Sequence, residues 1–168
     1  MNFMHRHFVR RAAPLLLALA GLAAAPARSQ AAEISVLVGS GSPDTVWSTY
    51  WGGALTISLF SIVHGEIEGG WQGGALEATS LYTANAKAYL GPTLGGRFVP
   101  YLGIGAGVYH QSLPIDDDQG TLGLVFTGAK LKFPMGLVLR GEYQWVSLPD
   151  AAPQKLDNRY FFGVGLSF

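Results

Sequence analysis

The final ten residues of the chain, RYFFGVGLSF at 159–168, alternate between large apolar side chains and small or polar ones. Because side chains two apart in a strand lie on the same face, this alternation predicts a β-strand with one apolar face and one small or polar face. Only Phe161 breaks the pattern. The apolar parity consists of Tyr160, Phe162, Val164, Leu166 and Phe168. A strand of this kind needs a partner strand on each side and an apolar surrounding for one face.

The opposite end of the chain has the features of a secretory signal peptide. Histidines and arginines within residues 5–11 precede an apolar segment at 15–25, which is shorter than the about 20 residues that a membrane-spanning helix requires. Small residues at Ser29 and Ala31 favour cleavage after Ala31, with Ala27 and Ala32 as alternatives. We therefore expect residues 1–31 to be a cleaved signal peptide and residues 32–168 to form a single exported domain.

The composition excludes several classes of function. The chain has no cysteine, which excludes a disulfide framework, thiol catalysis and cysteine metal sites. Four of the 11 basic residues precede residue 32, so 7 basic residues remain against 11 acidic ones, a formal net charge of −4 for 32–168. No basic run and no nucleotide-binding motif is present, so the sequence indicates neither nucleic acid nor a bound cofactor.

Period-two alternation recurs along the rest of the exported segment. After residue 31 no apolar run reaches the length of a membrane helix, although 49% of the chain is hydrophobic. A barrel reconciles these facts, because only alternate residues of each strand face the lipid. The expected strands cover residues 33–41, 50–60, 63–72, 81–91, 99–110, 121–133, 137–146 and 159–168. The sequence thus predicts an all-β fold, an eight-stranded antiparallel up-and-down transmembrane β-barrel.

Connector lengths and aromatic residues give this barrel a direction. The connectors after the second, fourth and sixth strands are short, whereas the others reach about eight to twelve residues and suit external loops. Aromatic side chains collect near both ends of the strands and predict two girdles at the membrane interfaces. The girdle near the loops contains Trp51, Trp71, Tyr82, Tyr109, Trp145, Tyr160 and Phe162, and the girdle near the turns contains Phe60, Phe98, Phe133 and Phe168.

The polar parity of the strands predicts a charged interior. Buried charges must be paired, so these residues are expected to neutralise one another in a closed lumen. Glycines at 103, 105 and 107 on the inward parity leave room for the long side chains. The expected lumen network contains His64, Glu66, Glu68, Lys87, Lys130, Lys132, Arg140, Glu142, Gln144 and Arg159. Because an eight-stranded barrel is just wide enough for its own side chains, we expect no diffusion pore.

Two internal stretches, PYLGIGAG at 100–107 and LRGEYQW at 139–145, resemble the small eight-stranded outer-membrane β-barrels, together with the terminal strand. This superfamily includes OmpA-like, OmpX-like and opacity-type proteins. The resemblance implies a monomeric, non-enzymatic barrel in the cell outer membrane, with a structural or surface-contact role. It also implies contacts with outer-membrane lipids and lipopolysaccharide, and recognition of the terminal Phe168 by the outer-membrane assembly machinery. External loops around 73–80, 111–120 and 147–158 would make any specific contacts.

Two other functions stay open at this stage. His110 and Ser112 have the His-x-Ser spacing found in lipid A deacylases, and Asp116, Asp117 or Asp118 could orient the histidine. The fuller motif of those enzymes is missing, so a lipid hydrolase is the alternative hypothesis. A soluble periplasmic barrel that binds a small ligand is the third. No metal site is expected, because the three aspartates lack the spacing of a calcium loop.

Overall fold

The computed structural model describes residues 32–43, 48–73, 80–112, 117–148 and 156–168, so the expected signal peptide lies outside the described residues. Within these ranges the chain forms eight strands, and a short 3₁₀ turn, η1 (Pro134–Gly136), lies between the sixth and the seventh. The strands are β1 (Ala32–Pro43), β2 (Ser48–Ser58), β3 (Val63–Gly73), β4 (Ser80–Leu90), β5 (Phe98–Ser112), β6 (Asp118–Lys132), β7 (Leu137–Ser147) and β8 (Leu156–Ser167). No helix in this described part is long and apolar enough to cross a membrane.

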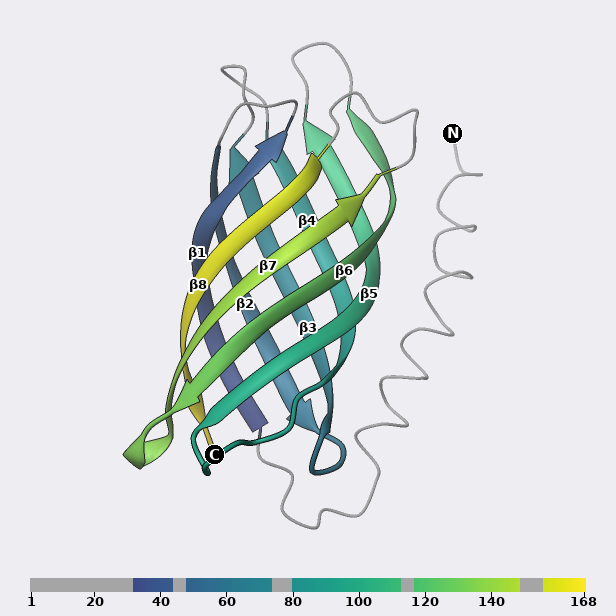
Figure 1. Ribbon diagram of the computed structural model, residues 1–168. Coiled ribbons are helices and arrows are strands. Elements are labelled where there is room, and N and C mark those ends of the chain that lie inside the picture. Colours follow the sequence, from purple (N-terminus) through teal and green to yellow (C-terminus); the bar gives the residue numbers. More distant parts are fainter. Residues whose placement is uncertain (1–31, 44–47, 74–79, 113–116, 149–155) are drawn as a thin grey trace, which may run out of the picture.

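The strands pair antiparallel in chain order, and β8 pairs with β1, which closes the barrel (Figure 1). In the β1–β8 pair, Val36 lies opposite Val164 and Ile34 opposite Leu166. The terminal strand therefore removes both sheet edges, whose unpaired backbone groups would be costly in lipid. The expected eight-stranded antiparallel barrel is confirmed.

The two ends of the barrel differ. We call the end that holds the β2–β3, β4–β5 and β6–β7 connections and the C-terminus the turn end, and the opposite end the loop end (Figure 1). β5 and β6 have 15 residues each and run further toward the loop end than expected. Only residues 113–117 separate them, so the expected connector of eight to twelve residues is too long here. The hydrogen-bonded ladder between β5 and β6 continues to the pair Gln111 and Asp118, in a polar segment that the sequence suggested was a loop.

Burial follows the expected alternation. Along β4, every second residue from Leu81 to Tyr89 is buried, while those between them are exposed. The exposed parity carries large apolar side chains around the barrel, including Val36, Leu102, Ile104, Val125, Val164 and Leu166, with exposed fractions from 46% to 67%. A contiguous apolar surface of this kind is typical of a face that meets lipid or another protein.

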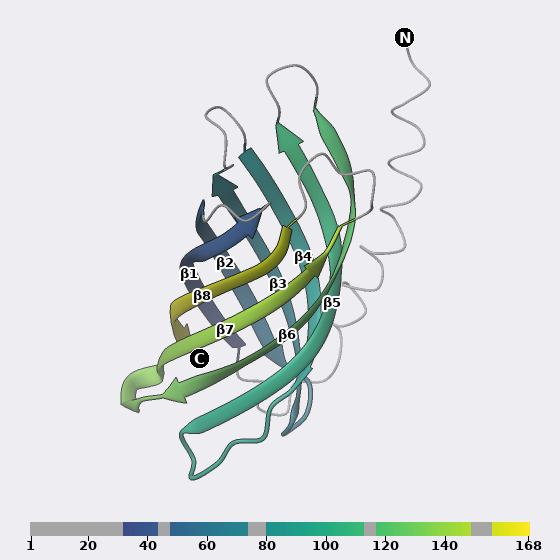
Figure 2. The same cartoon turned by 45° about the horizontal axis from the view of Figure 1, so that its top comes forward.

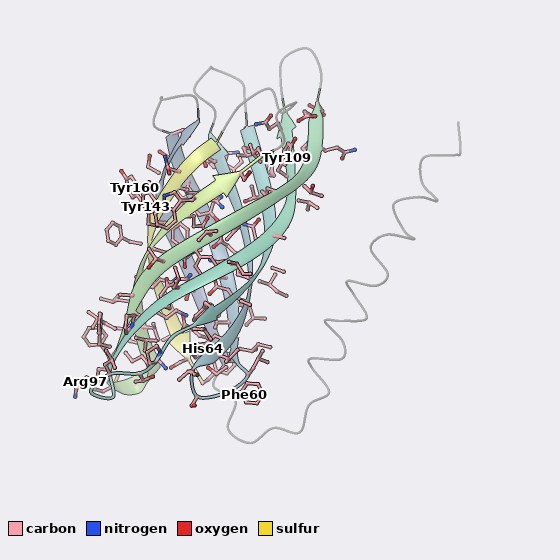
Figure 3. All side chains as sticks on the ribbon, turned by 45° about the vertical axis from the view of Figure 1, so that its right-hand side comes forward. Phe60, His64, Arg97, Tyr109, Tyr143 and Tyr160 are labelled. Atoms are coloured by element: carbon pink, nitrogen blue, oxygen red, sulfur yellow. The ribbon has the colours of Figure 1, made fainter. Side chains whose placement is uncertain are left out.

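Aromatic side chains mark the two ends of this surface. Trp51, Trp71, Tyr82, Trp145, Tyr160 and Phe162 are exposed toward the loop end, and Phe60, Phe98, Phe133 and Phe168 toward the turn end. Figure 3 shows Phe60 at the turn end and Tyr160 at the loop end. Tyr109 is an exception to the predicted girdle, because it is buried and donates a hydrogen bond to Asp118 Oδ2 at 2.9 Å. Tyr109 is separated by an even number of positions from Val99 and Tyr101, which are buried in β5, so its side chain faces inward as theirs do.

The interior is less uniformly polar than expected. Leu122, Leu124 and Phe126 on β6, which disrupt the polar parity in the sequence, are buried in one apolar cluster with Tyr89 and Tyr101. Phe161 is buried in a second cluster with Leu37 and Tyr50. Because the lumen of a small barrel is filled by side chains, its inward parity has to supply volume as well as charge.

Glycines accommodate this packing. A Cβ at Gly103 would lie 2.5 Å from Cζ of Phe126 and 2.6 Å from Cβ of Tyr89. At Gly105 it would lie 2.9 Å from the aliphatic part of Lys87. The inward glycines of β5 therefore leave space for the rings as well as for the charged side chains.

Candidate functional site

The charged residues inside the barrel balance one another. Among the described residues, the buried acidic side chains are Glu33, Glu66, Glu68 and Glu142, and the buried basic ones are Lys87, Lys130, Arg140 and Arg159. Four acids and four bases give a formal charge of zero. Glu33 was not among the expected lumen residues, although it shares its parity with Ser35 and Leu37 and opposes the apolar parity of β1. That parity was the signal that could have identified it.

Lys132 and His64, which were expected in the lumen network, lie near the turn end and outside the central group of ion pairs. Lys132 is half-buried and forms no ion pair with an acid in the described ranges. His64 is buried at the start of β3, where Nδ1 lies 3.0 Å from Ser58 Oγ and Nε2 lies 3.3 Å from the Gly91 carbonyl oxygen. His64 therefore shares a face with Glu66 and Glu68 but contacts different partners.

Lys87 is the centre of the network. Its Nζ donates hydrogen bonds to Glu66 Oε1 at 2.8 Å, Glu68 Oε2 at 2.8 Å and Glu142 Oε1 at 2.6 Å. An ammonium group has three donors, so all three are used. Because Glu66 and Glu68 lie on β3 and Glu142 lies on β7, Lys87 joins two walls of the barrel that are not neighbours in the strand order.

Arg140 forms a second connection between the same walls. Its guanidinium donates from Nη1 to Glu66 Oε2 at 2.8 Å and from Nη2 to Glu66 Oε1 at 3.1 Å, a bidentate pair. It also donates to Glu142 Oε2. Tyr101 completes the coordination of this carboxylate by donating its hydroxyl hydrogen to Glu142 Oε2 at 2.8 Å.

Arg159 holds the part of the network closest to the loop end. Its Nε donates to Gln144 Oε1 at 2.8 Å, and its Nη2 lies 3.5 Å from Glu68 Oε1. Gln144 in turn donates from Nε2 to Glu142 Oε1 at 2.7 Å. The terminal strand is thereby tied to β7 by side chains as well as by backbone pairing.

Lys130 forms a separate group toward the turn end. Its Nζ donates to Glu33 Oε1 at 2.9 Å and to the Tyr89 hydroxyl at 2.8 Å. Beside this group lies a cavity of about 20 Å³, which is room for about one water molecule. Its lining consists of Glu33, Thr56, Ser58, His64, Tyr89, Val99, Lys130, Lys132 and Ser167.

Each of the four buried cations also faces an aromatic ring. Lys87 Nζ lies 4.3 Å from the centroid of Phe126, and Arg159 Cζ lies 4.5 Å from that of Tyr50. Lys130 lies 5.2 Å from the ring of Tyr89, and Arg140 lies 5.7 Å from the ring of Phe161. Cations between a carboxylate and a ring face are stabilised from both sides. The two apolar clusters and the ionic network therefore form one packed interior.

The second candidate site lies on the outer surface near the loop end. His110 and Ser112 share the outward parity of β5, and Ser112 Oγ lies 3.4 Å from His110 Nε2. Asp117 Oδ2 lies 3.8 Å from the same nitrogen. Asp116 lies outside the described residues. In a hydrolytic triad the nucleophile and the orienting acid contact different nitrogens of the histidine. With both on Nε2, the described arrangement differs from a working triad.

No protein-family model matches this sequence. A search of curated proteins gave no match either.

Several solved structures have the same fold. Neisserial surface protein A aligns with a TM-score of 0.67 and 14% identity over 83% of this chain and 97% of its own. The N-terminal β-barrel domain of Pseudomonas aeruginosa OprF aligns with a TM-score of 0.59 and 20% identity, over 82% of this chain and 97% of its own. The outer membrane enzyme PagL aligns with a TM-score of 0.52 and 16% identity, over 80% of this chain and 98% of its own.

These likenesses establish the fold alone. The chain has the architecture of the small eight-stranded outer-membrane β-barrels, as its terminal strand and internal stretches indicated. One of the similar structures is an enzyme and others are not described as enzymes, so the fold leaves the activity undecided.

Proposed function

We propose that this protein is a non-enzymatic outer-membrane β-barrel with a closed lumen, and that it has a structural or surface-contact role. The observation that carries the proposal is the ionic network that crosses the lumen from Glu66, Glu68 and Lys87 to Arg140 and Glu142. These side chains are fully or almost fully buried. A lumen that is filled in this way favours neither transport nor storage of a ligand.

Energetics support a lumen that stays closed. Removing one partner of a buried ion pair typically costs about 3–5 kcal/mol, because the other charge remains buried without compensation. To open a path along the barrel axis, Lys87 and Arg140 would have to move away from their carboxylate partners. Glu66, Glu68 and Glu142 would then lie close together without a neutralising cation. The cavity of about 20 Å³ beside Lys130 is far smaller than the roughly 300 Å³ or more of a small-molecule pocket.

The outer surface of the barrel supports a location in the outer membrane and suggests an orientation there. The apolar belt with aromatic residues at both ends suits a bilayer, with the turn end in the periplasm and the loop end outside. Outer-membrane lipids, and lipopolysaccharide near the loop end, are then the partners of the outward face. The terminal Phe168, with 76% of its surface exposed, is the residue that we assign to recognition by the assembly machinery.

Two measurements test this proposal. Purified protein in planar bilayers should give no stepwise ion conductance, whereas steady channel openings would contradict a closed lumen. Cell fractionation should recover the protein in the outer membrane with heat-modifiable gel mobility, which is typical of folded barrels. Recovery in the soluble periplasm would instead support the ligand-binding alternative.

The contact between Ser112 Oγ and His110 Nε2 favours one second function, lipid hydrolysis at the outer surface. The lipid A of cells that express the protein can be compared with that of cells that express His110→Ala. Loss of an acyl chain that depends on His110 would establish the enzyme. Identical lipid A in both strains would remove this hypothesis and leave the non-enzymatic role.

A further inference from the structure

The cavity at the turn end of the lumen is lined by charges that do not cancel. Its lining includes one acid, Glu33, and two lysines, Lys130 and Lys132. Glu33 and Lys130 form an ion pair at 2.9 Å, and the four buried acids and four buried bases of the described chain sum to zero. Lys132 pairs with no acid in the described ranges, so it adds one positive charge that no described side chain balances.

Strand register gathers the lining of this cavity from most of the barrel wall. Ser167 lies opposite Glu33 in the β1–β8 pair, and Glu33 lies opposite Thr56 in the β1–β2 pair. On β6, Lys132 follows Lys130 at an interval of two, so both side chains enter the lumen from the same wall. The remaining lining residues come from β2 to β5. A species bound here would therefore lie between strands that do not pair with one another.

His64 lines the cavity as a neutral side chain, because a third positive charge beside two lysines would be repelled. Figure 3 shows His64 at the turn end. Its Nε2 lies 3.3 Å from the Gly91 carbonyl oxygen, which can only accept, so Nε2 carries the imidazole hydrogen. Nδ1 is then the acceptor for the Ser58 hydroxyl, 3.0 Å away. Neither His64 nor Ser58 has an uncommitted donor for the cavity.

The other polar groups of the lining also donate elsewhere. Thr56 Oγ1 donates to Glu66 Oε2 at 2.7 Å, and Ser167 Oγ donates to the Gly136 carbonyl oxygen at 3.3 Å. The three hydrogens of Lys130 Nζ point to oxygens of Glu33, Thr56 and Tyr89. The ammonium group of Lys132, with three donors and one charge, therefore remains for a species in the cavity.

We propose that this cavity binds a single chloride ion, held by Lys132. A volume of about 20 Å³ has room for about one water-sized particle, so a monatomic anion fits and the larger phosphate or sulfate does not. A metal cation would be repelled by the excess positive charge. Water would leave the charge of Lys132 without a counterion inside the barrel, which is unfavourable. Chloride satisfies both the size of the cavity and its charge.

The dependence of stability on chloride tests the site. The protein is purified in detergent micelles and unfolded in urea with sodium chloride or sodium gluconate, because gluconate has the same charge but is too large for the cavity. A ligand that binds only the folded state lowers the unfolding equilibrium constant by a factor of one plus its concentration over its Kd. With about 0.2 M salt and a Kd of about 0.1 M, we expect an unfolding constant about threefold lower in chloride.

K132Q should abolish the difference between the two salts, because it removes the charge while keeping a polar side chain. R97Q is the matched control. Arg97 is an exposed basic residue outside the cavity lining, so R97Q should keep the threefold difference. A chloride effect that persists in K132Q, or its absence in the wild type, would overturn the site.

Crystals grown with bromide in place of chloride locate the ion directly. We expect an anomalous peak in the cavity beside Lys132, and a map with no peak there would contradict the proposal. Both measurements need only the folded barrel, so their outcome is independent of the membrane location and of the surface-contact role proposed above.

Discussion

Lys87 Nζ on β4 lies 2.6 Å from Glu142 Oε1 on β7, although three strand-to-strand interfaces separate these strands in the barrel order. The pair spans the lumen, and the tilted walls that it joins are visible in Figure 2. Backbone pairing alone fixes each strand to its two neighbours. The Lys87–Glu142 pair adds a direct connection between opposite walls, so the interior contributes to the shape of the barrel as well as filling it.

We expect Lys87→Met to destabilise the barrel strongly. Glu66, Glu68 and Glu142 would remain together without their common cation, at a cost of about 3–5 kcal/mol. The measurement is the free energy of unfolding in urea, with the protein in lipid vesicles. Lys132→Met is the control, because Lys132 is half-buried and pairs with no described acid, so its effect should stay below about 1 kcal/mol. Equal effects of the two variants would contradict the central role of Lys87.

Lys130 and Glu33 should be energetically coupled. Their side chains are 2.9 Å apart and buried near the turn end, so each single change, Lys130→Met or Glu33→Gln, leaves the other charge unpaired. A double-mutant cycle measures the coupling, which we expect to be about 1–3 kcal/mol. Additive effects of the two substitutions would show that the pair makes no separate contribution.

Gly103→Ala should impair folding far more than Gly123→Ala. A Cβ at Gly103 would collide with the ring of Phe126 and with Tyr89, whereas at Gly123 it meets nothing within 4 Å. Overpacking of a filled interior typically costs about 1–3 kcal/mol. The fraction of folded protein after dilution from urea, read from heat-modifiable mobility, compares the two variants. Similar folded fractions would show that the lumen near Gly103 can adjust.

Deletion of Phe168 should reduce assembly in cells. The deletion removes the terminal aromatic side chain and the two backbone hydrogen bonds with Ala32, each 2.9 Å long. Phe168→Ala keeps the backbone and isolates the side chain, and it should lower the amount of folded protein in the outer membrane. Arg159→Ala, in contrast, should mainly weaken the interior network and lower the urea midpoint of the purified barrel. Normal assembly of the Phe168 deletion would contradict the role assigned to the terminus.

Alternation was sufficient to predict the strands. The pattern around Arg159 to Phe168 and in the other seven segments placed each strand within a few residues of its observed bounds, because a sheet with one face in lipid requires a period of two. The same parity placed Glu66, Lys87 and Glu142 inside. The alternation failed to predict the inward face near the loop end of β6. There the inward residues Leu122 and Leu124 are apolar, so they do not match the polar pattern of the other inward faces.

The alternation in the sequence by itself determined the class of fold, the direction of most side chains and the general location of the charges. Only the tertiary structure decided which charges pair and that Glu33 completes the balance. The physical reason is that strand parity is a local property of the backbone, whereas pairing across a lumen depends on strand tilt and register. Lys87 and Glu142 are 55 residues apart in the chain, and only the closed barrel brings them into contact.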